Sequence, residues 1–184
     1  GRETRAVIQV DIDDVLHGAL KVPANIALVH EGASLIDLAG QRLEIAGSFD
    51  ATQAQVFFGV GKVSLAPGST RQVLPQWWGS NDSDSVQAAI DVALECGAEV
   101  FMPAGSYTFD STVEAYFEDT GFNARALKVR GDGPGRTVIE NRVASGAAFY
   151  FGTRNPIAQQ AWFLTVEGLE VTSRSGRGQH GIEI

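Results

Sequence analysis

Cysteine, histidine and net positive charge are all scarce in this chain. The 184 residues include one cysteine, Cys96, and three histidines, His17, His30 and His180. A single cysteine forms neither a disulfide nor a cysteine-built zinc site within one chain, and the histidines are too scattered to indicate a metal triad. The formal charge of -8 lacks the clustered Lys and Arg that nucleic acids and anionic membranes attract. We therefore expect no metal ion, no bound cofactor and no nucleic-acid partner.

Long apolar runs are missing as well. No run reaches the roughly 18 residues that a membrane-spanning helix needs, so the sequence predicts no membrane span. Proline is infrequent, with 6 residues, whereas glycine is abundant, with 21. Many glycines between short apolar runs indicate short strands joined by tight turns. The hydrophobic content of 44% is too high for a disordered chain.

Short apolar runs follow one another closely before residue 75. Residues 5–15 partly alternate between apolar and polar, which is typical of a half-buried strand. Five further strands are predicted at residues 26–30, 34–38, 42–45, 55–58 and 62–65. Both a meander of hairpins and a solenoid fit such a pattern. Hairpins prefer Asn-Gly or Asp-Gly turns, and none occurs between residues 26 and 68. The pattern therefore favours a solenoid, and residues 1–74 are interpreted as a strand-rich N-terminal module.

One segment has helical spacing instead. Its apolar residues recur at the interval of one helix face: Val86, Ala89, Ile90, Ala93 and Leu94. Asp82 or Ser83 stands where an N-cap is expected, and Gly97 is placed to end the helix. The sequence predicts an amphipathic helix over residues 83–96.

Strand-like segments resume after this helix. They are predicted at residues 99–102, 106–109, 127–130, 137–141, 148–151, 162–166 and 169–172. The last four residues, Gly181 to Ile184, have the pattern of a further strand that is beginning. We therefore expect the chain to be a truncated piece of a longer protein.

Four linked motifs resemble a known family. They are Pro75-Gln-Trp-Trp-Gly79, Asn81-Asp-Ser83 with the helix Val86-Gln-Ala-Ala-Ile-Asp91, Val100-Phe-Met-Pro-Ala-Gly-Ser-Tyr107, and Leu127-Lys-Val-Arg-Gly-Asp-Gly-Pro-Gly-Arg-Thr-Val-Ile139. In this order they are similar to the N-terminal part of right-handed parallel β-helix proteins of the pectate-lyase-like superfamily, which includes phage tailspikes, polysaccharide lyases and glycoside hydrolases. The resemblance covers residues 75–172.

The resemblance implies a fold for the chain. It is an all-β, single-stranded right-handed parallel β-helix, a solenoid with one short N-terminal capping α-helix. Trp77 and Trp78 are expected to pack within the same cap. Residues 75–184 would hold the capping helix and the first coils.

A function follows from the same resemblance. The chain is expected to be the N-terminal part of an extracellular or virion-associated protein that processes polysaccharide, of the lyase, hydrolase or tailspike type, with a polysaccharide or cell-surface glycan as partner. The alternative is a non-catalytic carbohydrate-binding or structural module, such as an adhesin or a tail-fibre scaffold. Homotrimers are common among tailspikes, although no residue here encodes one. Ca²⁺ is implied only if the full-length protein is a lyase.

No catalytic motif is visible, but some carboxylates are candidates. Glycosidases use two carboxyl groups, and equivalent positions on adjacent parallel strands lie about 4.8 Å apart. Glu140 and Glu170 are the catalytic candidates, and Glu183 is a third carboxylate of the same kind. Charged strand residues usually face solvent, so we expect these to point outward and this piece of the protein to be inactive.

Aromatic residues are the candidates for sugar binding. Tyr116, Phe117, Tyr150, Phe151 and Trp162 lie in a half of the chain rich in loops. Alternation places Tyr150 on the opposite face from Phe149 and Phe151. Packing is the commoner role of such side chains. If they instead bind substrate, Tyr150 and Trp162 are the predicted contact residues.

Overall fold

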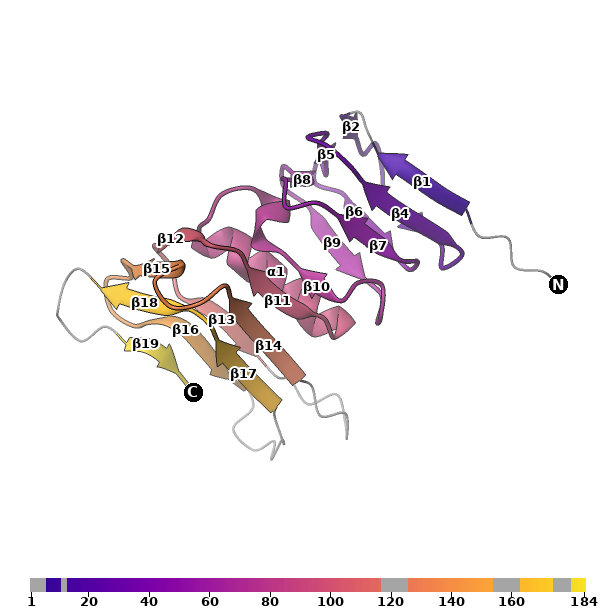
Figure 1. Cartoon of the computed structure of the whole chain (residues 1–184). Helices are drawn as coiled ribbons and strands as arrows, with labels where there is room; N and C mark the ends of the chain where they lie inside the picture. The colour runs from indigo at the N-terminus through magenta and orange to yellow at the C-terminus, as the bar shows by residue number, and fades with distance from the viewer. Residues whose placement is uncertain (1–5, 11–12, 117–125, 154–162, 174–179) are drawn as a thin grey trace.

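The computed structural model describes residues 6–10, 13–116, 126–153, 163–173 and 180–184. These residues form mostly β-structure, with one α-helix (Figure 1). The first nine strands are β1 (Ala6–Val10), β2 (Asp14–Val15), β3 (Leu20–Val22), β4 (Ile26–His30), β5 (Ile36–Asp37), β6 (Arg42–Ile45), β7 (Phe49–Ala51), β8 (Phe57–Phe58) and β9 (Lys62–Leu65). The other strands are β10 (Gln72–Val73), β11 (Glu99–Met102), β12 (Gly105–Phe109), β13 (Val113–Tyr116), β14 (Ala126–Gly131), β15 (Thr137–Asn141), β16 (Ala147–Gly152), β17 (Phe163–Glu167), β18 (Glu170–Ser173) and β19 (His180–Glu183).

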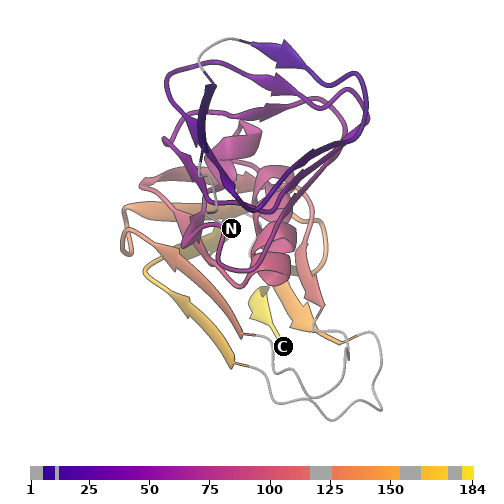
Figure 2. The ribbon, with the colours of Figure 1, turned by 90° about the vertical axis from the view of Figure 1, so that its right-hand side faces the viewer.

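Strands β1 to β9 form three parallel sheets, which we call the N-terminal stack. The strand orders are β1-β4-β7, β2-β5-β8 and β3-β6-β9. Each strand therefore pairs with the strand that lies three positions along the chain. Leu28 is in register with Phe49, and Ile36 with Phe57, and all four side chains are buried. The three sheets surround one interior, which Figure 2 shows from the N-terminal end of the molecule.

Strands β10 to β19 form the C-terminal stack, in which strands from β11 on follow the same rule and β10 pairs with β11. Its sheets have the orders β10-β11-β14-β17, β12-β15-β18 and β13-β16-β19, and all their pairs are parallel. Buried side chains again line up from strand to strand, as Tyr107 does with Ile139. The prediction of a mostly β protein with parallel strands is confirmed.

The single α-helix, α1 (Ser83–Cys96), has the predicted bounds. The Asp82 carboxylate accepts a hydrogen bond from the Ser85 N–H at 2.9 Å, which satisfies one of the free donors of the first turn. Gly97 ends the helix in the left-handed conformation, with φ 75°. Of the predicted apolar face, Ile90 is fully buried, whereas Leu94 is only half-buried.

Helix α1 lies between the two stacks and not at an end of the described chain (Figure 1). It packs against β9 of the N-terminal stack and β13 of the C-terminal stack. The 3-10 helix η1 (Pro75–Trp78) packs beside it against β8. The resemblance began at Pro75 and placed the helix as an N-terminal cap, while the strands before it were predicted as a separate strand-rich module. Those strands form a stack of their own, so the predicted cap has β-structure on both sides.

The double tryptophan of η1 packs as predicted. Trp77 is buried and meets the Phe49 ring edge-on, with ring centroids 5.0 Å apart. Trp78 is half-buried, and its ring lies 5.3 Å from that of Phe57. Both contacts reach into β7 and β8, so η1 closes the end of the N-terminal stack.

Two of the family-like motifs contact each other directly. Gln76, in the double-tryptophan motif, donates from Nε2 to the Tyr107 hydroxyl at 2.6 Å. Tyr107 ends the Pro-Ala-Gly motif, and its hydroxyl donates back to the Pro103 carbonyl at 3.0 Å. Burial raises the pKa of Tyr107 to about 12, so this phenol stays protonated and holds the two segments together. These two motifs therefore stabilise the fold by joining two segments of the chain.

Candidate functional site

The outer face of sheet β13-β16-β19 carries the predicted sugar-binding residue Tyr150. On β16, Phe149 and Phe151 are fully buried, whereas Tyr150 is half-buried on the opposite face. On β13, Val113 and Ala115 are buried in the same way. Side chains alternate between faces along a strand, so the outer face of β13 carries Glu114 and Tyr116.

Tyr116 and Tyr150 form an aromatic pair on this face. Their ring centroids lie 5.7 Å apart, with an interplanar angle of 54°. Gly152 is in register with Tyr116, and a Cβ atom at Gly152 would lie 2.6 Å from the Tyr150 ring. The missing side chain at Gly152 therefore leaves room for the Tyr150 ring. Sequence reasoning placed Tyr116 in a loop-rich region, and only strand register brings it to Tyr150.

Two carboxylates lie on either side of Tyr150. Glu114 on β13 and Glu183 on β19 are both in register with Tyr150, one on each side. Both side chains are exposed. Their backbones are two strand spacings apart, about 9.6 Å. Exposed carboxylates with an aromatic ring between them can accept hydrogen bonds from hydroxyl groups. We call Tyr116, Tyr150, Glu114 and Glu183 the tyrosine face.

The catalytic candidates Glu140 and Glu170 lie on another sheet, β12-β15-β18. They share its outer face but are not opposite each other, because Glu140 is in register with Thr172 and Glu170 with Val138. The Glu140 carboxylate also accepts a hydrogen bond from the Arg142 guanidinium at 2.8 Å. An ion-paired carboxylate beside an exposed one, offset by two residues, differs from the facing pair that glycoside hydrolysis uses.

The remaining sugar-binding candidate, Trp162, lies outside the described residues. Phe117 lies outside them as well, and Phe151 belongs to the core. Of the five aromatics grouped from the sequence, the structure therefore brings Tyr116 and Tyr150 together on an outer face.

A charged network covers the outer face of sheet β10-β11-β14-β17. Glu99 on β11 accepts hydrogen bonds from Arg130 at 2.9 Å and from Gln72 at 3.1 Å, and Lys128 lies 3.3 Å away. Lys128 also pairs with Glu167 at 2.8 Å. Burial raises the pKa of Glu99, but the hydrogen bonds from Arg130, Lys128 and Gln72 outweigh burial and hold it below its usual value.

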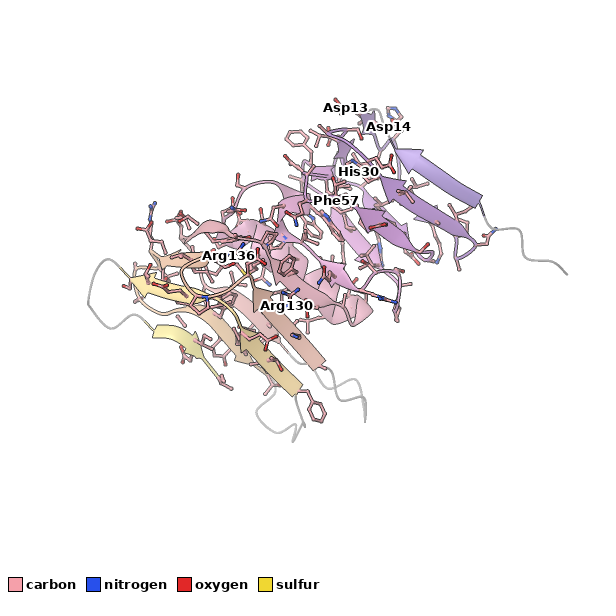
Figure 3. The ribbon with its side chains drawn as sticks, in the orientation of Figure 1. Asp13, Asp14, His30, Phe57, Arg130 and Arg136 are labelled. Carbon is pink, nitrogen blue, oxygen red and sulfur yellow. The ribbon has the colours of Figure 1, made fainter. Side chains whose placement is uncertain are left out.

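Arg130, labelled in Figure 3, also belongs to an Arg-Gly-Asp tripeptide, in which Arg130 and Gly131 end β14 and Asp132 follows it. Its guanidinium carbon lies 4.2 Å from the centre of the Phe101 ring. The Asp132 carboxylate accepts a hydrogen bond from the Ala104 N–H at 2.9 Å. A Cβ atom at Gly131 would lie 2.2 Å from the Gly168 carbonyl oxygen. These contacts hold the tripeptide in place at the end of β14.

The described residues offer neither a metal site nor a membrane-spanning helix. Among the described residues, no group of three or more His, Cys, Asp and Glu side chains is arranged to hold a metal ion. No helix in that part of the chain is long and apolar enough to cross a bilayer.

Comparison of the chain with protein-family models, with curated proteins and with solved structures found no match.

Proposed function

We propose that the two stacks and α1 form one right-handed parallel β-helix of the pectate-lyase-like kind. Two observations support this. In both stacks strands pair in parallel with the strand three positions along, except that β10 pairs with β11 across α1. Buried side chains also line up from one strand to the next. Right-handedness is expected because crossover connections between parallel strands are almost always right-handed. The order of the four sequence motifs supports the family.

We further propose that this part of the chain binds polysaccharide without cleaving it. The observation that carries this proposal is the Tyr116–Tyr150 ring pair, in which Tyr150 lies between two exposed carboxylates in register with it. The C–H faces of a pyranose ring are apolar and pack on aromatic rings, while its hydroxyl groups donate to carboxylates. Tyrosine suits such a surface because it joins an apolar ring to a polar group.

The fold and the tyrosine face fit an extracellular or virion-associated protein. Equivalent side chains repeat at each strand spacing, about 4.8 Å, so a long face can follow a chain of sugar units. In the longer protein that the resemblance implies, this surface would hold polysaccharide for a catalytic centre elsewhere. A purely structural module, the alternative, would show no glycan binding.

The test is glycan binding by the whole chain and by matched variants. A glycan array identifies the ligands, and titration calorimetry gives Kd for wild type and for Tyr150→Ala. Loss of one aromatic contact is expected to weaken binding roughly tenfold. Phe163→Ala is the control, because Phe163 is also an exposed aromatic, 66% accessible, on a different sheet. Absence of any glycan binding, or equal affinity of Tyr150→Ala and wild type, would contradict the proposal.

A further inference from the structure

A second aromatic surface lies on the N-terminal stack, where β8 and η1 end side by side. A cleft of about 530 Å³ opens there. Its lining residues come from these two segments: Gln55, Phe57, Phe58, Gly59, Trp78, Gly79 and Ser80. Sheet β2-β5-β8, which contributes its wall, differs from the sheet of the tyrosine face. We call it the aromatic cleft.

One side chain of the cleft is a large exposed aromatic. On β8, Phe57 (Figure 3) points into the core in register with Ile36 and is 1% accessible. Alternation then turns Phe58 outward, where it is 54% accessible. Phe57 lies against the Trp78 ring, 5.3 Å away. Phe58 and Trp78 are thus the two aromatic side chains of the lining that are accessible to a ligand.

The other side of the cleft is lined by two glycines and bordered by polar groups. Gly59 and Gly79 have φ of 74° and 115°, which side-chain-bearing residues rarely adopt. A Cβ atom at Gly79 would lie 3.1 Å from the Gln55 amide nitrogen. That nitrogen donates to the Phe57 carbonyl at 3.0 Å, which fixes the Gln55 amide at the rim. The Ser80 hydroxyl is a second polar group in the lining.

The chemistry of the lining selects a class of ligand. No charged residue lines it, and the charged side chain that borders it is acidic: Asp37 is in register with Phe58, and its Oδ1 would lie 2.5 Å from a Cβ atom at Gly59. A neutral ligand therefore fits better than an acidic one, which would meet no cation there. Aromatic faces beside an amide and a hydroxyl are complementary to a ring with apolar C–H faces and hydroxyl edges.

We propose that the aromatic cleft is a second glycan subsite, which takes a neutral hexopyranose or pentopyranose unit with Phe58 as its main stacking residue. The proposal rests on the polysaccharide-binding function proposed above and assigns the sugar class. It also makes the two surfaces different: the tyrosine face offers carboxylates to hydroxyl groups, whereas the cleft offers aromatic faces and uncharged polar groups.

The experiment is calorimetric titration of the whole chain with cellohexaose, maltohexaose, xylohexaose and mannohexaose, and with hexagalacturonate as the acidic comparison. At least one neutral hexasaccharide is expected to bind. Phe58→Ala should weaken it at least tenfold, and Phe58→Tyr should keep Kd within about threefold, because the ring is retained. Phe58 is largely exposed, so neither substitution removes a core contact. Phe163→Ala is the exposed-aromatic control.

The outcomes separate this proposal from the function of the tyrosine face. Binding of a neutral hexasaccharide that Phe58→Ala weakens, with or without an effect of Tyr150→Ala, supports the cleft as a subsite. Binding that only Tyr150→Ala weakens leaves the proposed function standing and overturns the cleft. The proposal is also overturned if no neutral hexasaccharide binds, if hexagalacturonate depends equally on Phe58, or if Phe58→Ala instead abolishes self-association in sedimentation velocity, since the occupant would then be a second copy.

Discussion

The side-chain amide of Gln87 pairs with the main chain of Glu114 as a neighbouring strand would. Gln87 Nε2 donates to the Glu114 carbonyl, and the Glu114 N–H donates to Gln87 Oε1, both at 2.7 Å. Glu114 lies on β13, the first strand of its sheet, whose outer edge faces α1. Strand edges with unpaired main-chain groups are prone to pair with other chains. One glutamine on α1 thus makes two of the main-chain hydrogen bonds that a further strand beside β13 would make.

Gln87→Ala should therefore destabilise the protein. Two main-chain groups lose their partners, but they lie near solvent and can bind water instead. We expect the free energy of unfolding to fall by about 1–2 kcal/mol. Chemical denaturation followed by circular dichroism measures this change. Gln53→Ala, at an exposed loop position, is the control and should change it by less than about 0.5 kcal/mol.

Ile90→Asp should prevent stable folding. Ile90 is fully buried on the face of α1 that packs between the stacks, and an aspartate there would bury an unpaired charge. We expect a loss above about 4 kcal/mol, visible as loss of the cooperative thermal transition. Glu95→Ala on the exposed side of the same helix should melt close to wild type. A wild-type melting curve for Ile90→Asp would show that α1 is not packed as described.

The Cys96 thiol should react slowly with alkylating agents. Cys96 is buried, and burial raises the pKa of its thiol, so little of the reactive thiolate exists at neutral pH. Its place in the last turn of α1 also disfavours a negative charge. We expect iodoacetamide at pH 7 to modify the native protein at least about tenfold more slowly than the urea-unfolded protein. Equal rates would contradict a structural role.

Glu99 should make the fold sensitive to acid. Its pKa is lower in the folded protein than in the unfolded chain, where the ordinary value is about 4.3. The stabilisation is therefore complete above about pH 4.3 and is lost as the pH falls through the folded-state pKa. Glu99→Gln should be less stable than wild type at pH 7, and the difference should shrink below about pH 4. Denaturation at pH 7, 5 and 3 tests this, and a constant difference would refute it.

The chain by itself should have neither hydrolase nor lyase activity. Glu140 is paired with Arg142 and is not opposite Glu170, so these two carboxylates lack the arrangement that separates an acid from a base. Assays for new reducing ends and for unsaturated products, on acidic and neutral polysaccharides, should remain at background. A signal that disappears in Glu140→Gln or Glu170→Gln would overturn this prediction, and Asp84→Asn, on the exposed face of α1, is the control variant.

The helix and several strands could be predicted from the sequence because their signals are local. Asp82, the apolar spacing and Gly97 define α1 to the residue. The strands at Ile26–His30, Arg42–Ile45 and Thr137–Asn141 also have the predicted bounds. Each is a short segment with apolar residues in a region rich in turn-forming ones, so neighbouring residues carry enough information.

Other strands were missed, because nothing in their own residues distinguishes them. Leu20–Val22 and Gln72–Val73 have only two or three residues, and hydrogen bonds to adjacent strands are what makes them extended. Val113–Tyr116 was not predicted as a strand either, because it lies in a region of the sequence that is rich in loops.

The candidate sites also combine features that the sequence predicts with features that only the tertiary structure determines. Alternation in the sequence determined that Tyr150 faces away from the core, since that depends only on its neighbours Phe149 and Phe151. Only the tertiary structure decided that Tyr116 is its partner and that Glu114 and Glu183 flank it, because strand register sets these contacts between distant segments. The aromatic cleft likewise depends on η1 lying beside β8, and a local pattern cannot specify which segments of a chain become neighbours in space.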